Sequence, residues 1–359
     1  MSFLRLNRRR IDPSALLAAA LLLAAGCASA PRRTAAGRAP VPLPPELAAY
    51  YDYPDHAPQA SQERVRAARG VTEFLVRFPL SVPSGFEPTE PVVELEWFES
   101  DAPGRRPAIL FNPILGGDYP LERGLCRFLA RQGFHVALAR RKTLKISPEH
   151  GVDRIELLLR QGVLRMRQVV DWMAAQERVD PSRLGSFGIS MGGMAGVLAA
   201  AVEPRLKAHV VALAGGGIAD ILATSPDPLL ARPRARYLRA RSMSLAELDA
   251  ALRAAIVTDP IRLAPYVDPS ELFMLIAAFD RTIGRDNALR LWRALDRPPA
   301  VLLFSGHYTA YLYLPYVKRA SLRYFRRTLG PPSQKGSDPL YKGSDPLAVG
   351  LALRRRWRL

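Results

Sequence analysis

The sequence predicts an α/β fold in which a mostly parallel sheet is flanked by helices. Between residues 71 and 304, short runs of β-branched and apolar residues alternate with longer stretches whose apolar residues have helical spacing. This alternation is typical of parallel strands joined by crossover helices. The composition agrees with a folded chain, because 48% of the 359 residues are hydrophobic and 23% are charged, which excludes a disordered or collagen-like protein.

Each expected element follows from its own apolar pattern. Residues 71–78 and 92–98 are expected to open the sheet as an antiparallel pair. The following strands are expected at 108–111, 134–139, 184–189, 208–213, 272–278 and 300–304. Helical spacing predicts helices at 121–132, 154–176, 191–201, 245–256 and 287–295. Because helices carry the chain back between strands, most strands are expected to be parallel.

The N-terminus has the layout of a secretory signal. Residues 1–14 carry Arg5 and three further arginines, and an unbroken Ala/Leu run follows over residues 15–25. The run has about half the roughly 20 residues that a membrane-spanning helix needs. Small residues precede Cys27, so a cleaved signal peptide (1–26) is favoured over a permanent anchor.

Residues 23–27, Leu-Ala-Ala-Gly-Cys, resemble the lipobox of bacterial lipoproteins. The resemblance implies that Cys27 is acylated, becomes the mature N-terminus and holds the protein on the membrane, since several acyl chains give stable anchoring. Ala28 follows the cysteine rather than Asp, and the resemblance then implies the outer membrane. An ordinary signal peptide with a nearby cysteine is the alternative.

The remaining organisation divides into tether, domain and tail. Residues 27–45 are rich in Ala, Pro and Arg and are expected to be a tether. Residues 46–330 are expected to form one domain, with a helical insertion at 218–269 between the sixth and seventh expected strands. Residues 331–359 contain a duplicated Lys-Gly-Ser-Asp-Pro-Leu segment and a basic end, and are expected to be a disordered tail.

A candidate nucleophile stands where the strand 184–189 meets the helix 191–201. The sequence there is Gly188-Ile189-Ser190-Met191-Gly192, the Gly-x-Ser-x-Gly pattern of a nucleophile elbow. The turn is so tight that side chains two positions before and after Ser190 would collide, which explains the two glycines. The alternative is that Ser190 only caps the helix.

A serine nucleophile needs an imidazole base, and the base needs an acid that fixes its tautomer. Of the five histidines, His307 directly follows the last expected strand. Asp280 stands at the end of the preceding strand and is the expected acid, with Asp286 and Asp259 as alternatives. Four tyrosines after His307 are expected to be packing aromatics: Tyr308, Tyr311, Tyr313 and Tyr316.

With the order Ser190, Asp280, His307, the chain resembles the α/β-hydrolase superfamily over roughly residues 71–329. It looks closest to the dienelactone-hydrolase-like and acyl-esterase branch, because Val-Asp-Pro-Ser-Arg-Leu at residues 179–184 leads into the elbow. True dienelactone hydrolases have cysteine where Ser190 stands. The resemblance implies an α/β-hydrolase fold, an acyl-enzyme mechanism, and a lid in segment 218–269. A solvated helix pair is the alternative for that segment.

The oxyanion of acyl transfer needs preorganised N–H donors. The Met191 amide is expected to supply one of them. The second is expected from the turn after strand 108–111, where relatives often have His-Gly and this chain has Asn112-Pro113-Ile114. Pro113 has no N–H, so Ile114 is the expected donor and Leu115 is the second choice.

Other function classes find little support in the sequence. A formal net charge of +18 invites a nucleic-acid interpretation, but no basic-aromatic recognition motif accompanies it. No metal-ligand cluster, phosphate loop or dinucleotide fingerprint is present, so no metal and no cofactor are expected. Cys126 lies in an amphipathic stretch and is expected to be a core residue.

The predicted function is a membrane-tethered serine hydrolase that cleaves a small-molecule or lipid-like carboxylic ester. Ser190 would be the nucleophile, His307 the base and Asp280 the orienting acid. The alternative is a catalytically silent lipoprotein that uses the same fold as an envelope binding or scaffold protein. The expected partners are the ester and the bacterial membrane, and no nucleic acid. The sequence does not predict the acyl chain length or the oligomeric state.

Overall fold

The computed structural model describes residues 39–54, 59–116, 118–141 and 148–330. The predicted signal peptide, Cys27, most of the predicted tether and the duplicated tail lie outside these residues. Among the described helices, none is both long and apolar enough to cross a membrane.

The described strands form one sheet in the order β1-β2-β3-β5-β4-β6-β7-β8-β9. The first three strands and β5 pair antiparallel, and from β5 to β9 every pairing is parallel. The strands are β1 (Ser61–Ala68), β2 (Val71–Pro79), β3 (Val92–Ser100), β4 (Arg106–Asn112), β5 (His135–Ala139), β6 (Val179–Ile189), β7 (Leu206–Ala212), β8 (Leu272–Ala277) and β9 (Ala300–Leu303).

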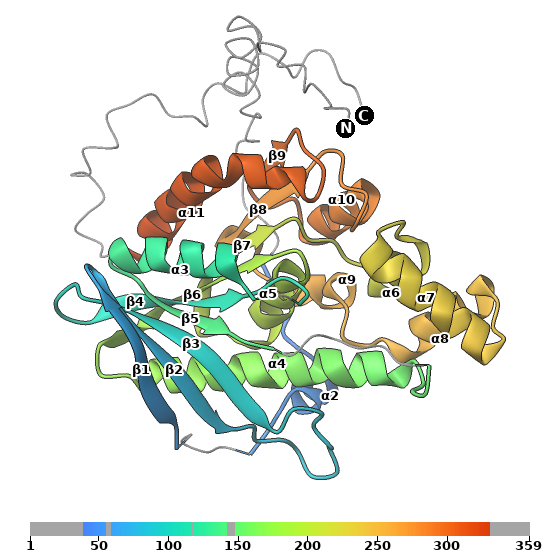
Figure 1. The fold of residues 1–359 in the computed structure, drawn as a ribbon, viewed down its shortest axis with the longest axis horizontal. Helices are drawn as coiled ribbons and strands as arrows, with labels where there is room; N and C mark the ends of the chain where they lie inside the picture. The colour runs from blue at the N-terminus through green and yellow to red at the C-terminus, as the bar shows by residue number, and fades with distance from the viewer. Residues whose placement is uncertain (1–38, 55–58, 117, 142–147, 331–359) are drawn as a thin grey trace, which may run out of the picture.

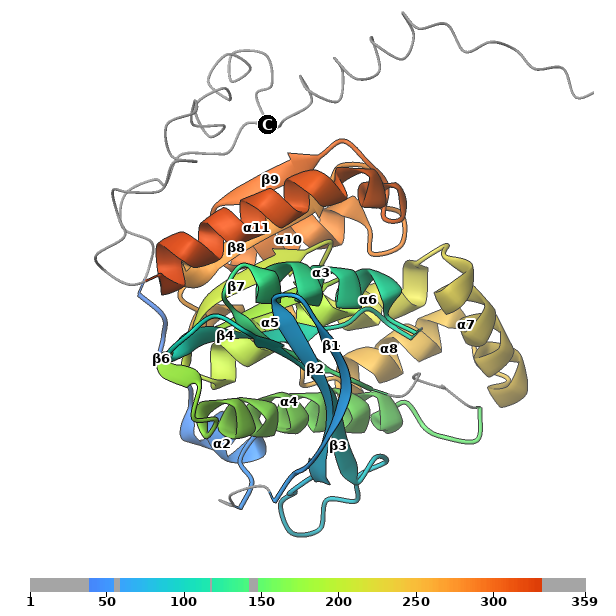
Figure 2. The same ribbon diagram turned by 60° about the vertical axis from the view of Figure 1, so that its left-hand side comes forward.

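Helices cover both faces of the sheet (Figures 1 and 2). The α-helices are α2 (Pro45–Tyr50), α3 (Pro120–Arg131), α4 (Asp153–Ala174), α5 (Met191–Val202), α6 (Ile218–Thr224), α7 (Pro228–Arg241), α8 (Leu245–Ala255), α9 (Pro260–Leu263), α10 (Arg285–Ala294) and α11 (Leu314–Leu329). Short 3-10 turns are η1 (Ala264–Tyr266), η2 (Pro269–Glu271) and η3 (Thr309–Tyr313). Helices α3 and α11 pack on one face, and α4 and α5 pack on the other.

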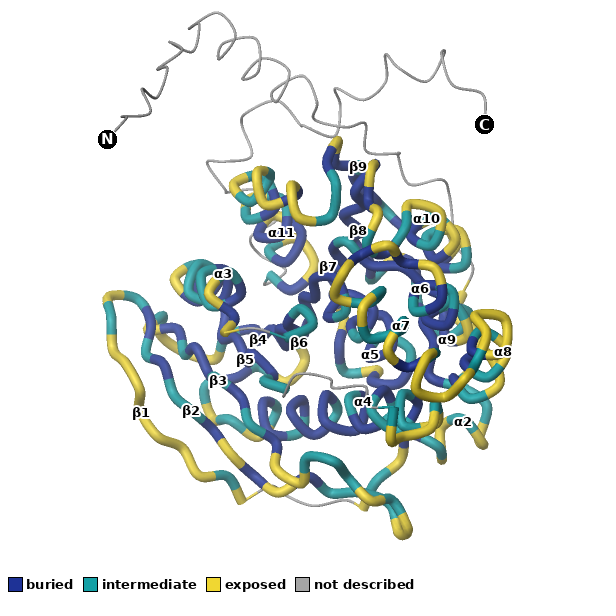
Figure 3. Tube along the Cα trace, turned by 45° about the vertical axis from the view of Figure 1, so that its right-hand side comes forward, coloured by how far each residue is buried: buried dark blue, intermediate teal, exposed yellow. Residues whose placement is uncertain are grey.

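The core lies in the two layers between the sheet and its helices. On the α3 and α11 side, Phe111 and Phe187 stack on each other with ring centroids 4.9 Å apart. On the α4 side, Trp97 meets Trp172 edge to face at 5.1 Å. The central strands and the inner faces of α4 and α5 are buried, whereas β1 is exposed along its length (Figure 3). The parallel strands are therefore held rigidly at the edge where the candidate site residues lie.

The predicted α/β-hydrolase architecture is confirmed, with three additions outside the insertion. Helix α2 and strand β1 precede the predicted antiparallel pair, and helix α11 follows the last strand. The helical insertion occurs where it was predicted. In the structure it lies between the seventh and eighth strands, because β1 adds one strand to the count.

Residues just before the predicted boundary between tether and domain at residue 45 contact the domain. The Val41 amide donates a hydrogen bond to the Pro265 carbonyl at 3.0 Å. Leu43 and Leu47 pack against the core beside α4. These few apolar side chains are enough to hold a proline-rich segment against the domain, although its composition alone predicts a tether.

Candidate active site

The turn between β6 and α5 is a formed nucleophile elbow. Ser190 has φ 57° and ψ −122°, in a region that non-glycine residues rarely adopt. A Cβ on Gly188 would collide with the Gly192 carbonyl, and a Cβ on Gly192 would collide with the Asn112 carbonyl. The two glycines are thus required by close backbone approach, as the sequence predicts. The strained turn presents the Ser190 side chain at the end of the strand.

Ser190, His307 and Asp280 form a continuous hydrogen-bonded chain. His307 Nε2 lies 3.0 Å from Ser190 Oγ, and His307 Nδ1 lies 2.8 Å from Asp280 Oδ2. The other carboxylate oxygen of Asp280 accepts hydrogen bonds from the amides of Thr282 and Ile283, both at 2.9 Å. Asp280 is therefore fixed by its own backbone turn, and it holds Nε2 of the imidazole toward the serine. These three residues are the ones predicted from the sequence.

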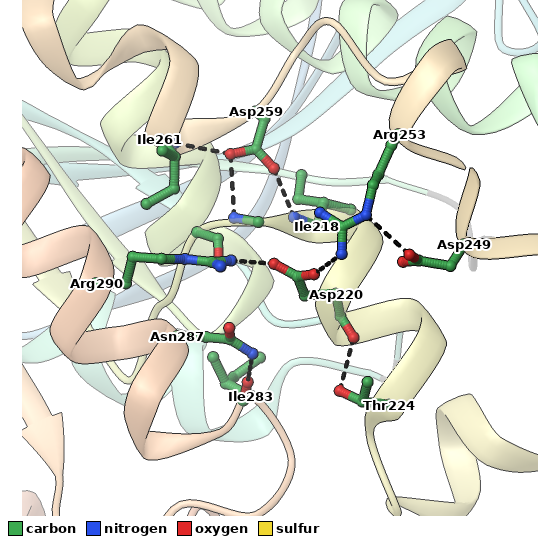
Figure 4. A network of polar contacts seen from close by, with 12 residues as sticks. Ile218, Asp220, Thr224, Asp249, Arg253, Asp259, Ile261, Ile283, Asn287 and Arg290 are labelled. Atoms are coloured by element: carbon green, nitrogen blue, oxygen red, sulfur yellow. Dashed lines mark hydrogen bonds and ion pairs between the residues drawn. The ribbon is translucent and has the colours of Figure 1, made fainter. Parts of the chain in front are cut away.

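The two alternative acids have other positions. Asp259 accepts hydrogen bonds from the amides of Gly217, Ile218 and Ile261 at 2.5–3.1 Å, as Figure 4 shows. It joins the start of α6 to the start of α9 and does not contact His307. Asp286 is exposed in the first turn of α10.

The amides of Met191 and Ile114, which are predicted to bind the oxyanion, differ in whether they already donate to another group. Met191 is the first residue of α5, where an amide has no acceptor within the helix, and it lines the same cavity as Ser190. The Ile114 amide instead donates to Glu122 Oε1 at 3.3 Å. Glu122 is fully buried in α3 and needs donors, which explains why this amide is engaged. In this conformation Ile114 is not free to bind an oxyanion, and Leu115, the second choice, also lines the cavity.

A cavity of about 930 Å³ opens beside Ser190 and His307. Its walls come from the loop after β4, from α4 and α5, from the inserted helices α6 to α8, and from the residues after β9. Most of the lining is aliphatic, as in Leu159, Met194, Ile221 and Leu252. A wall of this kind suits a substrate with a substantial apolar part.

Two of the four tyrosines after His307 are not packing residues. Tyr308 and Tyr311 are each 63% exposed and line the cavity, whereas Tyr313 and Tyr316 pack against the core as predicted. The turn that carries His307 continues directly into η3, so these side chains follow His307 to the cavity. The spacing of the four tyrosines is compatible with the packed face of a helix. The sequence alone therefore does not distinguish the tyrosines that line the cavity from those that pack against the core.

Partly buried polar contacts fasten the inserted helices to the loops that carry His307 and Asp280. Asp227 Oδ2 accepts hydrogen bonds from Tyr308 Oη and Thr282 Oγ1, both at 2.7 Å. These contacts join the N-terminus of α7 to the loops that carry His307 and Asp280. Burial opposes ionisation of Asp227, but the hydrogen bonds outweigh it and lower the pKa of the carboxyl. We call this contact the α7 latch.

A second polar cluster, drawn in Figure 4, fixes the other side of the insertion. Asp220 of α6 bonds Arg253 of α8 and Arg290 of α10. Arg253 also reaches Asp249 one helical turn earlier, at 2.9 Å. The insertion is thus attached both to the catalytic loops and to α10.

Cys126 is fully buried and carries no disulfide, as predicted for a core residue. Burial raises the pKa of its thiol well above the ordinary value, which makes it a poor nucleophile. Within the described ranges, no group of three or more His, Cys, Asp or Glu side chains is placed to hold a metal ion.

Comparison with known proteins found a matching family model and similar solved structures. A model of the prolyl oligopeptidase family matches residues 163–297, a segment that contains Ser190 and Asp280 and ends before His307. A search of curated protein sequences found no match.

Among solved structures, acetyl xylan esterase from Paenibacillus sp. R4 is similar at a TM-score of 0.58 and 16% identity, covering 76% of this chain and 90% of that one. Acetyl xylan esterase 1 from Thermoanaerobacterium sp. JW/SL YS485 has a TM-score of 0.57 and 16% identity, covering 80% of this chain and 96% of that one.

The acylaminoacyl peptidase of Pyrococcus horikoshii is similar at a TM-score of 0.53 and 13% identity, and the match covers 77% of this chain but 52% of the peptidase. At these identities the structural matches establish the fold. Together with the family match and the Ser190–His307–Asp280 chain, they place this protein in the α/β-hydrolase superfamily as a serine hydrolase.

Proposed function

We propose that this protein hydrolyses carboxylic esters through an acyl-enzyme intermediate. The observation that carries the proposal is the formed Ser190–His307–Asp280 chain at the edge of a large apolar cavity. The two structural neighbours named as acetyl xylan esterases support an ester rather than a peptide substrate. The chain also spans about half of the similar peptidase, so the remainder of that enzyme has no counterpart in the match.

The reaction follows from the positions of the three side chains. His307 Nε2 takes the proton of Ser190 Oγ as the oxygen attacks the ester carbonyl. The negative charge that forms on the carbonyl oxygen is stabilised by the Met191 amide and by a donor from the loop at 112–116. His307 then protonates the leaving alcohol. In the second half, His307 accepts a proton from water as the water attacks the acyl group, and returns it to Ser190. Asp280 remains ionised and stabilises the imidazolium.

The second oxyanion donor is either the Ile114 amide, released from Glu122 when substrate binds, or the Leu115 amide. Pro113 fixes the backbone before both residues and has no N–H of its own. The aliphatic wall from the insertion would then act as a lid and exclude water from the acyl group.

The test is turnover of a series of 4-nitrophenyl esters of increasing acyl length. Ser190→Ala is expected to lower kcat at least about 10³-fold. Ser182→Ala is the matched control, because Ser182 lies on the same strand and its hydroxyl contacts only Asp180 at the surface. Equal activity of both variants, or no turnover by a folded protein, would overturn the proposal and favour the silent scaffold.

We also propose that Cys27 carries the lipid that holds the hydrolase on the outer membrane. Support comes from the Leu-Ala-Ala-Gly-Cys sequence and the basic, apolar leader before it. Metabolic labelling with a fatty acid should mark the wild-type protein and not Cys27→Ser, and Cys126→Ser should be labelled normally. Loss of membrane association in Cys27→Ser is expected, and retention would contradict the anchor.

A further inference from the structure

The mostly apolar wall of the cavity also contains charged side chains. Among the described residues that line it, there are four arginines and one carboxylate: Arg141, Arg165, Arg234, Arg236 and Glu90. Arg234 is used structurally, since its guanidinium donates to the carbonyls of Leu222 and Ser225. Arg141, Arg165 and Glu90 form a separate group, which we call the arginine corner.

Contacts within the arginine corner hold its members together. Arg165 of α4 pairs with Glu90 at 2.5 Å and donates to the Arg140 carbonyl at 3.5 Å. The next residue along the chain is Arg141, the second residue after β5. Glu90 is thus paired with Arg165, while the guanidinium of Arg141 donates to a backbone carbonyl.

Each of the two guanidiniums has an N–H group without a hydrogen-bond acceptor among the described residues. The Nε atoms of Arg141 and Arg165 are buried and have no hydrogen-bond partner. The side chain of Arg165 is 7% exposed. Burial lowers the pKa of Arg141 to about 10, which reports the cost of keeping this cation away from water. Buried cations are normally paired, and each buried N–H normally has an acceptor. The corner thus has a positive charge and donors that no described side chain uses.

The arginine corner adjoins the reacting centre. Arg141 Nη2 donates to the Pro113 carbonyl at 3.0 Å, and Pro113 precedes the two candidate oxyanion donors. The Tyr119 hydroxyl, at the start of α3, donates to the Arg141 carbonyl at 2.8 Å and fixes the backbone there. Arg141, Ser190 and His307 line the same cavity. A substrate can therefore place its ester at Ser190 and a second group at the arginine corner.

We propose that the arginine corner binds a carboxylate carried by the substrate, so that the enzyme prefers esters whose apolar chain ends in a negative charge. The inference rests on the proposed esterase function. A guanidinium presents its donors in a planar fork that matches the two oxygens of a carboxylate. The aliphatic lining of the cavity that Ser190 and Arg141 share would accommodate the chain that joins ester and carboxylate. Arg141 is the specificity-determining residue, and Arg165 assists while it remains paired with Glu90.

The experiment compares two 4-nitrophenyl esters of equal length, one made from suberic acid and ending in a free carboxylate, and one ending in the neutral amide. The wild type is expected to have the higher kcat/KM for the carboxylate ester. In Arg141→Gln this preference should fall about tenfold to hundredfold, which corresponds to losing a hydrogen bond to a charged group. The loss should be larger for the carboxylate ester than for the amide ester, and an unchanged circular dichroism spectrum and melting temperature show that the variant is folded.

Three further variants sharpen the result. Arg141→Lys should retain part of the preference, because it keeps the charge and loses the fork. Glu90→Gln should increase the preference, since it removes the carboxylate that competes with the substrate, and a purely structural role would not predict an increase. Arg239→Gln is the control, because Arg239 is an exposed arginine of α7 that does not line the cavity. It should leave the preference unchanged.

Several outcomes would overturn the inference. If the wild type hydrolyses both esters equally, or if Arg141→Gln keeps the full preference, the corner does not select substrates while the esterase function stands. If neither ester is cleaved, nor any of the neutral acyl series, the proposed function itself fails. A chain that ends in a phosphonate tests the alternative anion, and a preference for it over the carboxylate would show that the corner selects another oxyanion.

Discussion

At the residue scale, the account depends on the exact position of His307. The imidazole is held between Asp280 at 2.8 Å and Ser190 at 3.0 Å, and Asp280 is held by two backbone amides. In the proposed mechanism, the carboxylate selects the tautomer with hydrogen on Nδ1 and leaves Nε2 as the base. A change that preserves the shape of residue 280 but removes its charge should affect chemistry more than folding.

Asp280→Asn is expected to lower kcat for a neutral ester by about 10³- to 10⁴-fold, because an amide can favour the wrong imidazole tautomer. Stability should change little, since the remaining oxygen can still accept from Thr282 and Ile283. Asp286→Asn is the control, because Asp286 was the alternative acid and is exposed on α10. Similar kcat losses in both variants would show that the assignment of the acid is wrong.

The triad could be predicted from the sequence because chain order and strand ends restrict each member strongly. Ser190 has flanking glycines, and Asp280 and His307 each follow an apolar strand. The availability of Ile114 could not be predicted, because it depends on Glu122, a buried carboxylate eight residues later that the sequence presents as an ordinary helical residue. Arg141 was missed for the same reason, since a basic residue after a strand has no pattern that marks burial.

At the element scale, the α7 latch links the insertion to the catalytic loops. Tyr308 and Thr282 both donate to the N-cap residue of α7, Asp227. Burial, together with the hydrogen bond to this carboxylate, raises the pKa of Tyr308 to about 12, so the hydroxyl remains a donor at neutral pH. The position of the insertion over the cavity is thereby coupled to the loop that carries His307.

Tyr308→Phe should loosen α7 without removing any catalytic group. Amides of residues 228–241 are expected to exchange with deuterium faster, and KM for a long-chain ester should rise more than kcat falls. Tyr311→Phe is the matched control, because Tyr311 is equally exposed and lines the same cavity. Unchanged exchange in α7 would contradict the role given to the latch.

The latch also has an expected pH dependence. The folded pKa of Asp227 lies below the ordinary value of a carboxyl. The ionised Asp227 carboxylate therefore stabilises the folded state at pH values above the ordinary pKa of a carboxyl. This stabilisation is lost as the pH falls through the lower pKa that Asp227 has in the folded state. The protection of the α7 amides, taken relative to the intrinsic exchange rate at each pH, should therefore fall on acidification in the wild type, and less so in Tyr308→Phe.

The one strand that the sequence did not predict has a physical explanation. Strand β1 is exposed on both faces and contains Ser, Gln, Glu and Arg, so it lacks the alternation that burial imposes on a strand. It forms because β2 offers an open edge for antiparallel pairing. The central parallel strands are buried on both faces, and their apolar runs are correspondingly easy to recognise.

At the scale of the whole molecule, stability should depend on two buried histidines outside the site. His135 and His209 are fully buried, and burial lowers the pKa of each to about 4. His135 is held by the Ser100 amide and the Arg178 carbonyl, and His209 by the Ser186 hydroxyl. Both rings are accommodated in the neutral form, in contacts that join neighbouring strands.

The free energy of unfolding should therefore be highest above pH 6.5 and fall as the pH approaches 4. A histidine whose pKa is lower in the folded than in the unfolded state stabilises the fold at pH values above the unfolded pKa. On acidification this contribution to the free energy of unfolding is lost, by roughly 3 kcal/mol at most for each histidine. Urea titrations at pH 7, 5.5 and 4.5 measure this slope. In His209→Gln, which keeps a hydrogen-bond partner for Ser186, the slope should be shallower. An identical slope would show that His209 does not titrate in this range.

The central claim is that Ser190 is an activated nucleophile, and labelling with a fluorophosphonate tests it most directly. The account predicts a single adduct on the peptide that contains Ser190, formed in the wild type, greatly slowed in His307→Ala and absent in Ser190→Ala. A folded wild-type protein whose Ser190 remains unmodified under conditions that label other serine hydrolases would contradict the account.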